Sequence, residues 1–271
     1  MTTDLVDLPP RFGMDRPAFE KLGTRPPGEL RAATSVILAR DGAGGLEVFL
    51  LQRADGMAFA AGMSVFPGGG LDAGDRTALA DGLVDAGTAA EAAASWGTGP
   101  EDAAALLACA ARETYEETGV LLADDALPAP GTRERLAARE IGMRDVVGHL
   151  AADRLRPWAR WLTPEPMPRR YDTAFFVAAV PEGQEPDGAT SEAVGAGWCA
   201  PTRALREWDE KDRALMPPTW AVLTELAAAP DVASLLAAAA DRRPRPVTPS
   251  LRPAGERVGI AVPAHAIGAA R

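Results

Sequence analysis

Residues 109–120, CAARETYEETGV, place one arginine and three glutamates at the end of an alanine-rich segment that stops at a glycine. The segment opens at Pro100, which suits the first position of a helix, and two acidic residues follow it in the first turn. Gly119 suits the C-terminal cap, where a left-handed backbone ends a helix. The sequence therefore predicts a helix over residues 100–119, with a buried apolar first half and charge in its last two turns.

The three glutamates of this helix fall on one face. At 100° per residue, Glu113, Glu116 and Glu117 occupy an arc of about 100° and span about 6 Å along the axis. Carboxylates at this spacing repel by roughly 0.2–0.5 kcal/mol per pair. Their hard oxygen atoms suit Mg²⁺ or Mn²⁺, and a bound cation would remove the repulsion. The alternative is a solvated charged helix end, in which Arg112 pairs with one glutamate.

A glycine-rich stretch, FPGGGLDAGD (66–75), follows a short predicted strand. Glycine lets the backbone approach a ligand closely and adopt positive φ angles. The alternative is a flexible turn.

Together the two stretches resemble the Nudix box of Nudix hydrolases. Residues 112–120 match its second half, and Gly69 followed by Asp75 matches its first half, with Asp in place of Glu. Thirty-six residues separate the halves where the usual box has seven, which implies an insertion of 29 (36 − 7). A split box, and the segments at 50–69, 170–183 and 216–226, resemble the branch that includes peroxisomal coenzyme A diphosphatase-like proteins.

The resemblance implies an α+β fold, a Nudix-type α/β/α sandwich with a mixed sheet. It implies hydrolysis of a pyrophosphate bond in a nucleoside diphosphate linked to another moiety, with coenzyme A or acyl-CoA among the candidates, and Mg²⁺ or Mn²⁺ as cofactor. Glu116 and Glu117 would be metal ligands, Glu113 would be a ligand, the general base or both, and Arg112 would orient Glu113 or Glu117. The Gly68–Gly70 backbone would supply a carbonyl to the metal and pack closely against the helix. The alternatives are a non-catalytic Nudix-fold nucleotide sensor and a purely structural protein.

Further residues are candidates on the same basis. Glu192 would supply a later carboxylate, and Arg53, with Arg169 and Arg170, would receive the non-reacting phosphates; each is otherwise a surface residue. The motif tied to coenzyme A recognition has Thr and Ser where this chain has Leu51 and Ala54. We expect Asp75 to have a structural role, pairing with Arg112, and Asp72 is a comparable candidate. Trp220 is expected in the core, or stacked on a base.

Three segments are predicted along the chain. Residues 1–30 read as an irregular arm, residues 31–210 as the Nudix domain with its insertion at 76–108, and residues 211–271 as helices and an extended tail on the same domain. The insertion is either a surface excursion or a part of substrate access. The further predicted elements are strands at 33–40, 46–53, 170–180 and 194–200, and helices at 88–96, 131–149, 201–211, 217–229 and 231–240.

The amino-acid composition limits the classes of molecule that this protein is expected to bind. The net charge of −10 argues against a general binder of nucleic acid or membrane surfaces, so a small-molecule nucleotide is the expected partner. Cys109 and Cys199 provide no disulfide framework and are expected to be buried thiols. The N-terminus does not read as a signal peptide, and no apolar run approaches the ~20 residues of a bilayer span, so we expect a cytoplasmic protein. A homodimer is compatible with the sequence.

Overall fold

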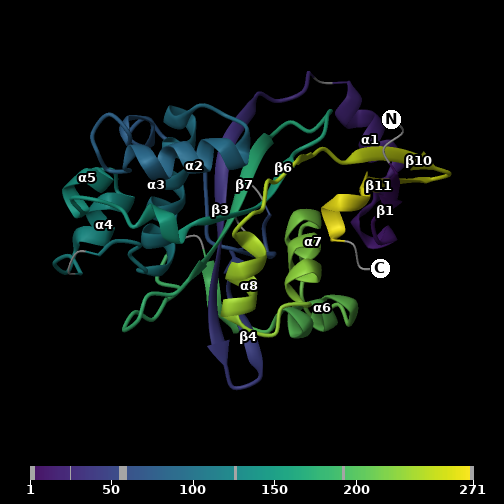
Figure 1. The fold of residues 1–271 in the computed structure, drawn as a ribbon. Helices are drawn as coiled ribbons and strands as arrows, with labels where there is room; N and C mark the ends of the chain where they lie inside the picture. Colours follow the sequence, from purple (N-terminus) through teal and green to yellow (C-terminus); the bar gives the residue numbers. More distant parts are fainter. Residues whose placement is uncertain (1–3, 25, 55–59, 125–126, 191–192, 269–271) are drawn as a thin grey trace.

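A seven-stranded mixed sheet separates two layers of helices (Figure 1). The structure is a computed structural model and describes residues 4–24, 26–54, 60–124, 127–190 and 193–268. The strand order is β5-β4-β3-β7-β6-β9, and β8 also pairs with β4. The strands are β3 (Leu30–Gly42), β4 (Gly45–Arg53), β5 (Ser64–Val65), β6 (Arg156–Leu162), β7 (Arg170–Ala179), β8 (Ala193–Cys199) and β9 (Pro246–Val247). The predicted α/β/α sandwich with a mixed sheet is confirmed.

The centre of the sheet is built from β3 and its two neighbours. β3 and β4 form the predicted antiparallel hairpin, while β3 and β7 run parallel over ten residue pairs. Side chains alternate along β3, so Val36 and Leu38 enter the core under one helical layer, and Ile37 and Ala39 enter the core under the other. Burial on both faces explains why these strands read as continuous apolar runs.

The predicted glutamate-bearing helix is α3 (Pro100–Thr118), and it lies on the same face as α2 (Ala86–Trp96). Gly119 caps α3 in a left-handed conformation, with φ +75° and its N–H donating to Tyr115 O at 2.9 Å. Ala104, Ala108 and Ala111 are fully buried, and their small side chains let the helix approach its neighbours closely. Both helices confirm the predictions for residues 88–96 and 100–119.

The opposite face carries α6 (Pro201–Asp209), α7 (Pro217–Leu226) and α8 (Val232–Ala239), as predicted (Figure 1). Trp220 on α7 packs against Phe12 and Trp208, which confirms a core position for it. Among the described residues, no helix has both the length and the hydropathy needed to span a bilayer.

The two chain ends differ from the prediction, because they form a second sheet. The expected irregular arm contains β1 (Leu5–Asp7), β2 (Met14–Asp15) and α1 (Arg16–Gly23). The expected extended tail contains β10 (Ser250–Ala254) and β11 (Arg257–Pro263), and β11 pairs with β1, β2 and β10. These strands are short, and β1 and β2 find their partner more than 240 residues away, so the local sequence carries little signal for them.

Two further elements were not predicted correctly. The helix expected over 131–149 is two short helices, α4 (Thr132–Ala137) and α5 (Met143–Val146). The break follows from the backbone, since Arg139 has φ +60° and Gly142 is extended. Strand β6 was missed because its sequence, RPWARWL, mixes proline and arginine with two buried tryptophans.

Candidate active site

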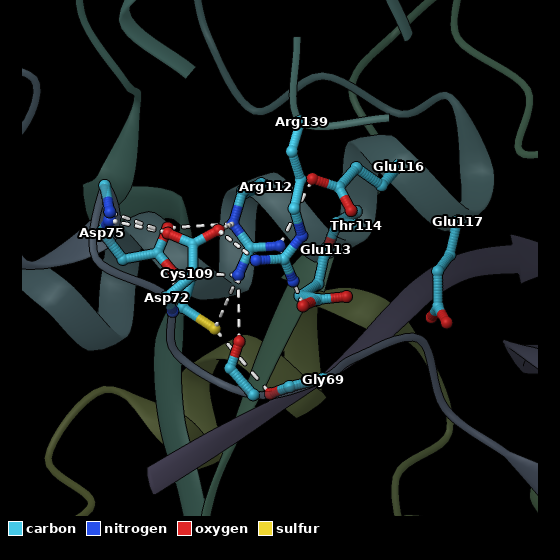
Figure 2. Close-up of polar contacts among 12 residues, drawn as sticks. Gly69, Asp72, Asp75, Cys109, Arg112, Glu113, Thr114, Glu116, Glu117 and Arg139 are labelled. Atoms are coloured by element: carbon cyan, nitrogen blue, oxygen red, sulfur yellow. Dashed lines mark hydrogen bonds and ion pairs between the residues drawn. The ribbon is translucent and has the colours of Figure 1, made fainter. Parts of the chain in front are cut away.

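The glutamate end of α3 meets the glycine loop that follows β5 (Figure 2). The Gly68 N–H donates to Glu117 Oε2 at 2.7 Å. A Cβ atom added to Gly69 would lie 2.5–2.7 Å from the carboxylate atoms of Glu113. The structure therefore brings together the two halves of the split motif, although 36 residues separate Asp75 from Arg112.

Strand β3 fixes the conformation of the glycine loop. The Thr34 N–H donates to Gly69 O at 2.9 Å, and the Val36 N–H donates to Pro67 O at 2.8 Å. Gly68 has φ +154°, and a Cβ there would lie 2.1 Å from Thr34 O. Only glycine fits this close approach of two backbone segments, so the loop is held by the core of the sheet.

Arg112 organises the acidic residues around the loop. Its side chain is 6% exposed and binds Asp75 with two hydrogen bonds, Nε to Oδ1 at 3.0 Å and Nη2 to Oδ2 at 2.8 Å. Nη1 donates to Glu113 Oε1 at 2.9 Å and to Glu116 Oε1 at 3.3 Å, while Nη2 also donates to Gly70 O at 3.0 Å. The predicted pairing of Asp75 with Arg112 is confirmed, and the buried guanidinium links helix α3 to the glycine loop.

Electrostatics keep this guanidinium charged. Burial by itself lowers the pKa of Arg112, but the hydrogen bonds that it donates to Asp75 and the charges of Glu113 and Asp75 outweigh burial and raise that pKa. Asp72 shapes the loop: its Oδ1 accepts from the N–H groups of Gly74 and Asp75 at 2.8 and 3.2 Å, and its Oδ2 lies 3.6 Å from Arg112 Nε. Arg112 therefore stays protonated and anchored on the loop side.

Burial also perturbs the carboxylates. It raises the pKa of Glu113 to about 7, with Arg112 lowering that value and Glu116 raising it further. Burial likewise raises the pKa of Glu116, against the lowering effect of Arg112. Both side chains are within reach of a ligand, at 14% and 18% exposure. The charge of Arg112 therefore does not fully offset the cost of burying the ionised carboxylates of Glu113 and Glu116.

The thiol next to this network is structural. Burial raises the pKa of Cys109 well above its ordinary value. Its Sγ accepts from the Thr34 hydroxyl at 3.2 Å and donates to Gly69 O at 3.8 Å. Cys109 and Cys199 are both buried and free, as predicted.

The expected convergence of three glutamates on one point is not what the structure contains. Within the described part of the chain, no group of three or more His, Cys, Asp or Glu side chains is placed to hold a metal ion. Instead Glu113 and Glu116 share Arg112 Nη1, and Glu117 turns to the Gly68 N–H. The donor chemistry still fits a divalent cation, because the hard carboxylates of Glu113 and Glu117 contact the glycine loop, with Glu116 next to Glu113 on Arg112. Burial raises the pKa values of Glu113 and Glu116.

The remaining candidates have different outcomes. Glu192 lies outside the described residues. Arg53 is the last residue of β4, and its N–H donates to Met63 O at 3.0 Å. Arg170 is engaged near the start of β7, where it donates to Thr163 O at 3.2 Å and lies 3.4 Å from Glu165. Arg169 immediately precedes β7.

Sequence reasoning missed a cavity of about 170 Å³ beside the glycine loop. Its walls include Leu71 and Arg76 from the loop and Leu106 from α3, and the insertion contributes Trp96 and Asp102. Leu106 lies seven residues, about 10 Å, before Glu113 on the same face of α3. No local pattern in the alanine-rich insertion indicates this cavity, because it arises only when the insertion packs against the sheet.

The mixed sheet, the capped glutamate helix and the glycine loop define the class, a Nudix fold. A model of the NUDT19 Nudix domain matches residues 81–226, more than half of the chain. The chain therefore belongs to the Nudix hydrolase family, in the group of the NUDT19 Nudix domain, and the predicted family is confirmed.

Similar proteins agree with this assignment. The human acyl-coenzyme A diphosphatase NUDT19 is 31% identical over 229 residues, covering 68% of this chain and 61% of that protein. The putative nudix hydrolase 7 of Caenorhabditis elegans is 27% identical, over 74% of this chain and 62% of that protein. The crystal structure of a NUDIX hydrolase from Alicyclobacillus acidocaldarius superposes with a TM-score of 0.64 at 27% identity, covering 78% of this chain and 96% of that one. The chain thus spans less than two thirds of the two curated relatives.

Proposed function

We propose that this protein hydrolyses a pyrophosphate bond in a nucleoside diphosphate linked to another moiety, with coenzyme A or acyl-CoA as the first candidate substrate. One observation carries the proposal: the carboxylates of Glu113 and Glu117 contact the glycine loop, and a buried arginine holds Glu113 together with Glu116. The candidate substrate comes from the human relative, whose name is acyl-coenzyme A diphosphatase.

In the proposed reaction, each residue of the site has a separate role. Hydrolysis adds water across one P–O–P linkage and gives two phosphate products. Glu113, packed against Gly69 and held by Arg112 at 2.9 Å, is the carboxylate placed to accept the proton of the attacking water. Arg112 orients Glu113 without contacting substrate, since Asp75 and the Gly70 carbonyl already bind it. The absence of side chains at Gly69 and Gly70 lets the backbone approach the phosphates.

A cation is part of the proposal. Glu116 and Glu117, with Glu113, would hold Mg²⁺ or Mn²⁺. Such an ion supplies charge neutralisation of the pyrophosphate and lowers the pKa of bound water. The raised pKa values of Glu113 and Glu116 support this role, because a nearby cation stabilises the ionised carboxylates.

The cavity beside the loop suits the part of the substrate that does not react. Arg76 stands at its exposed edge, next to Asp75 of the Arg112 network, and the insertion supplies Trp96 and Thr98. This arrangement supports a part for the insertion in substrate access.

Glu117→Gln tests the proposal. Glutamine keeps the acceptor for the Gly68 N–H but loses the charge, so we expect an unchanged melting temperature and a fall in kcat of at least about 10²-fold. Phosphate release is measured with Mg²⁺ or Mn²⁺ over coenzyme A, acyl-CoA, ADP-ribose, NADH and dinucleoside polyphosphates. A variant that turns over at the wild-type rate contradicts the role of Glu117.

The second candidate, a nucleotide sensor, gives a different result in the same experiment. A sensor would be stabilised against heat by one of these nucleotides and would release no phosphate from any of them. The presence of all three glutamates together with Arg112 favours the enzyme.

A further inference from the structure

A second cavity, also of about 170 Å³, lies on the face of the sheet opposite α3. Its floor is Trp158 and Trp161 of β6, which belong to the core under α7 and α8. Its walls come from the segment after α8 and from His265 in the short turn Ala264–Ile267, which packs on α7 (Figure 1). The sheet therefore separates this cavity from the glutamate–glycine site.

Hydrogen-bond donors inside the cavity have no acceptor. Trp161 is 3% exposed, and its Nε1 is buried without a partner among the described residues. His265 Nε2 is also buried and unpartnered. Burial, followed by the charge of Arg245, lowers the pKa of His265, so the ring is neutral at pH 7 and can donate through Nε2. A buried N–H group without an acceptor is destabilising, and a bound acceptor would remove that cost.

Four arginines line the same cavity: Arg160 of β6, which pairs with Asp172 at 2.6 Å, and three from the segment after α8. Arg242 lies over the Trp158 ring at 3.8 Å from its centroid and pairs with Glu225 at 2.6 Å. Arg243 and Arg245 are exposed at its edge and form no ion pair within the described part of the chain. The lining therefore carries four positive charges against the one negative charge of Glu225, in a protein whose net charge is −10.

We propose that this cavity is a binding site for a phosphate dianion, either free phosphate or the phosphate group of a phosphomonoester. The lining residues come from three separate elements, strand β6, the arginine segment and the His265 turn, so groups from different parts of the chain meet at this cavity. Arginine is well suited to phosphate, because its guanidinium presents several N–H groups in a fixed plane. The site is independent of the pyrophosphate hydrolysis proposed above.

The experiment uses the full chain in EDTA, so that cations do not recruit phosphate to the glutamates. Inorganic phosphate is titrated at constant ionic strength by calorimetry and by ¹H–¹⁵N spectra of the tryptophan indoles. We expect saturable binding with a Kd near or below ~1 mM, accompanied by a shift of the Trp161 indole resonance, which Trp161→Phe identifies by its loss. Adenosine 3′-phosphate forms the second arm: tighter binding than free phosphate marks a phosphomonoester as the ligand, and equal or weaker binding marks free phosphate.

The double variant R243Q/R245Q removes two exposed charges and is expected to raise the Kd at least about tenfold. Its matched control is R206Q/R252Q, which removes two exposed arginine charges outside the cavity and should leave the Kd unchanged. Trp161→Phe keeps an aromatic floor and should raise the Kd about threefold or more. The proposal is overturned if wild-type protein shows no saturable binding, if the two double variants behave alike, or if phosphate leaves the Trp161 resonance unmoved.

Discussion

The buried pair of Arg112 and Asp75 gives the sharpest test of how the site is held together. Asp75→Asn removes the charge but keeps the size of the side chain. Asp75 is 2% exposed and Arg112 6%, and two hydrogen bonds of 3.0 and 2.8 Å join them. Breaking a buried ion pair costs roughly 3–5 kcal/mol. Because Arg112 keeps Glu113 and the Gly70 carbonyl as partners, we expect the lower end, about 3 kcal/mol.

Urea denaturation followed by circular dichroism measures this loss. With an m-value of about 3 kcal/mol/M, the midpoint should fall by about 1 M. Asp72→Asn is the matched control, because Asp72 lies 3.6 Å from Arg112 Nε, is 24% exposed and keeps its Oδ1 acceptor as asparagine. We expect that control to lose less than about 1 kcal/mol. Equal losses in the two variants would refute the assignment of Asp75 as the residue that anchors Arg112.

Three further outcomes are expected. Gly69→Ala should lower kcat at least about tenfold with little change in melting temperature, because the added Cβ meets only the movable Glu113 carboxylate, at 2.5–2.7 Å; wild-type kcat would contradict this. Because Glu113 has a pKa of about 7 against an ordinary 4.5, the folded metal-free chain holds a proton that the unfolded chain releases. Its free energy of unfolding should therefore fall by up to about 3 kcal/mol from pH 5 to pH 8, and urea titrations of Glu113→Gln should lack that slope. Arg76→Gln should raise KM for the best substrate about tenfold at unchanged kcat, with Arg206→Gln as the exposed control.

Local patterns were sufficient for the central part of the fold. The Pro100 start, the alanine face and the Gly119 cap define α3, because each acts within one or two turns of the helix. The β3–β4 hairpin follows from apolar runs on either side of a glycine turn. Parts that depend on distant partners escaped prediction. The β1–β11 pairing, Leu5 with Pro263, joins the two ends of the chain, and no short window of sequence contains both.

In the site, too, local sequence predicted some features, while others depend on contacts made only in the folded chain. The types of residue and their helical spacing indicated Arg112 and the glutamates, and the Asp75 partner followed from the motif. The orientation of each carboxylate could not be predicted, since it depends on which donor is nearest in the folded chain. Glu117 turns to the Gly68 N–H because β3 fixes that loop, and Glu113 and Glu116 turn to Arg112. These contacts replace the single convergence point that the helical wheel suggested.

The insertion does little to destabilise the contact between the two halves of the motif, because closing the longer loop between them costs little entropy. Lengthening the span between Asp75 and Arg112 from seven to 36 residues adds about 1.4 kcal/mol of loop-closure entropy, from (3/2)RT ln(36/7). The Asp75–Arg112 pair closes that loop at its ends, while Val84 and Ala89, both fully buried, and Trp96, 4% exposed, pack the inserted residues onto the core. A buried valine alone contributes about as much as the added entropy costs. The inserted segment can therefore wall a new cavity beside the loop while the glutamates and glycines keep the contacts that define the site.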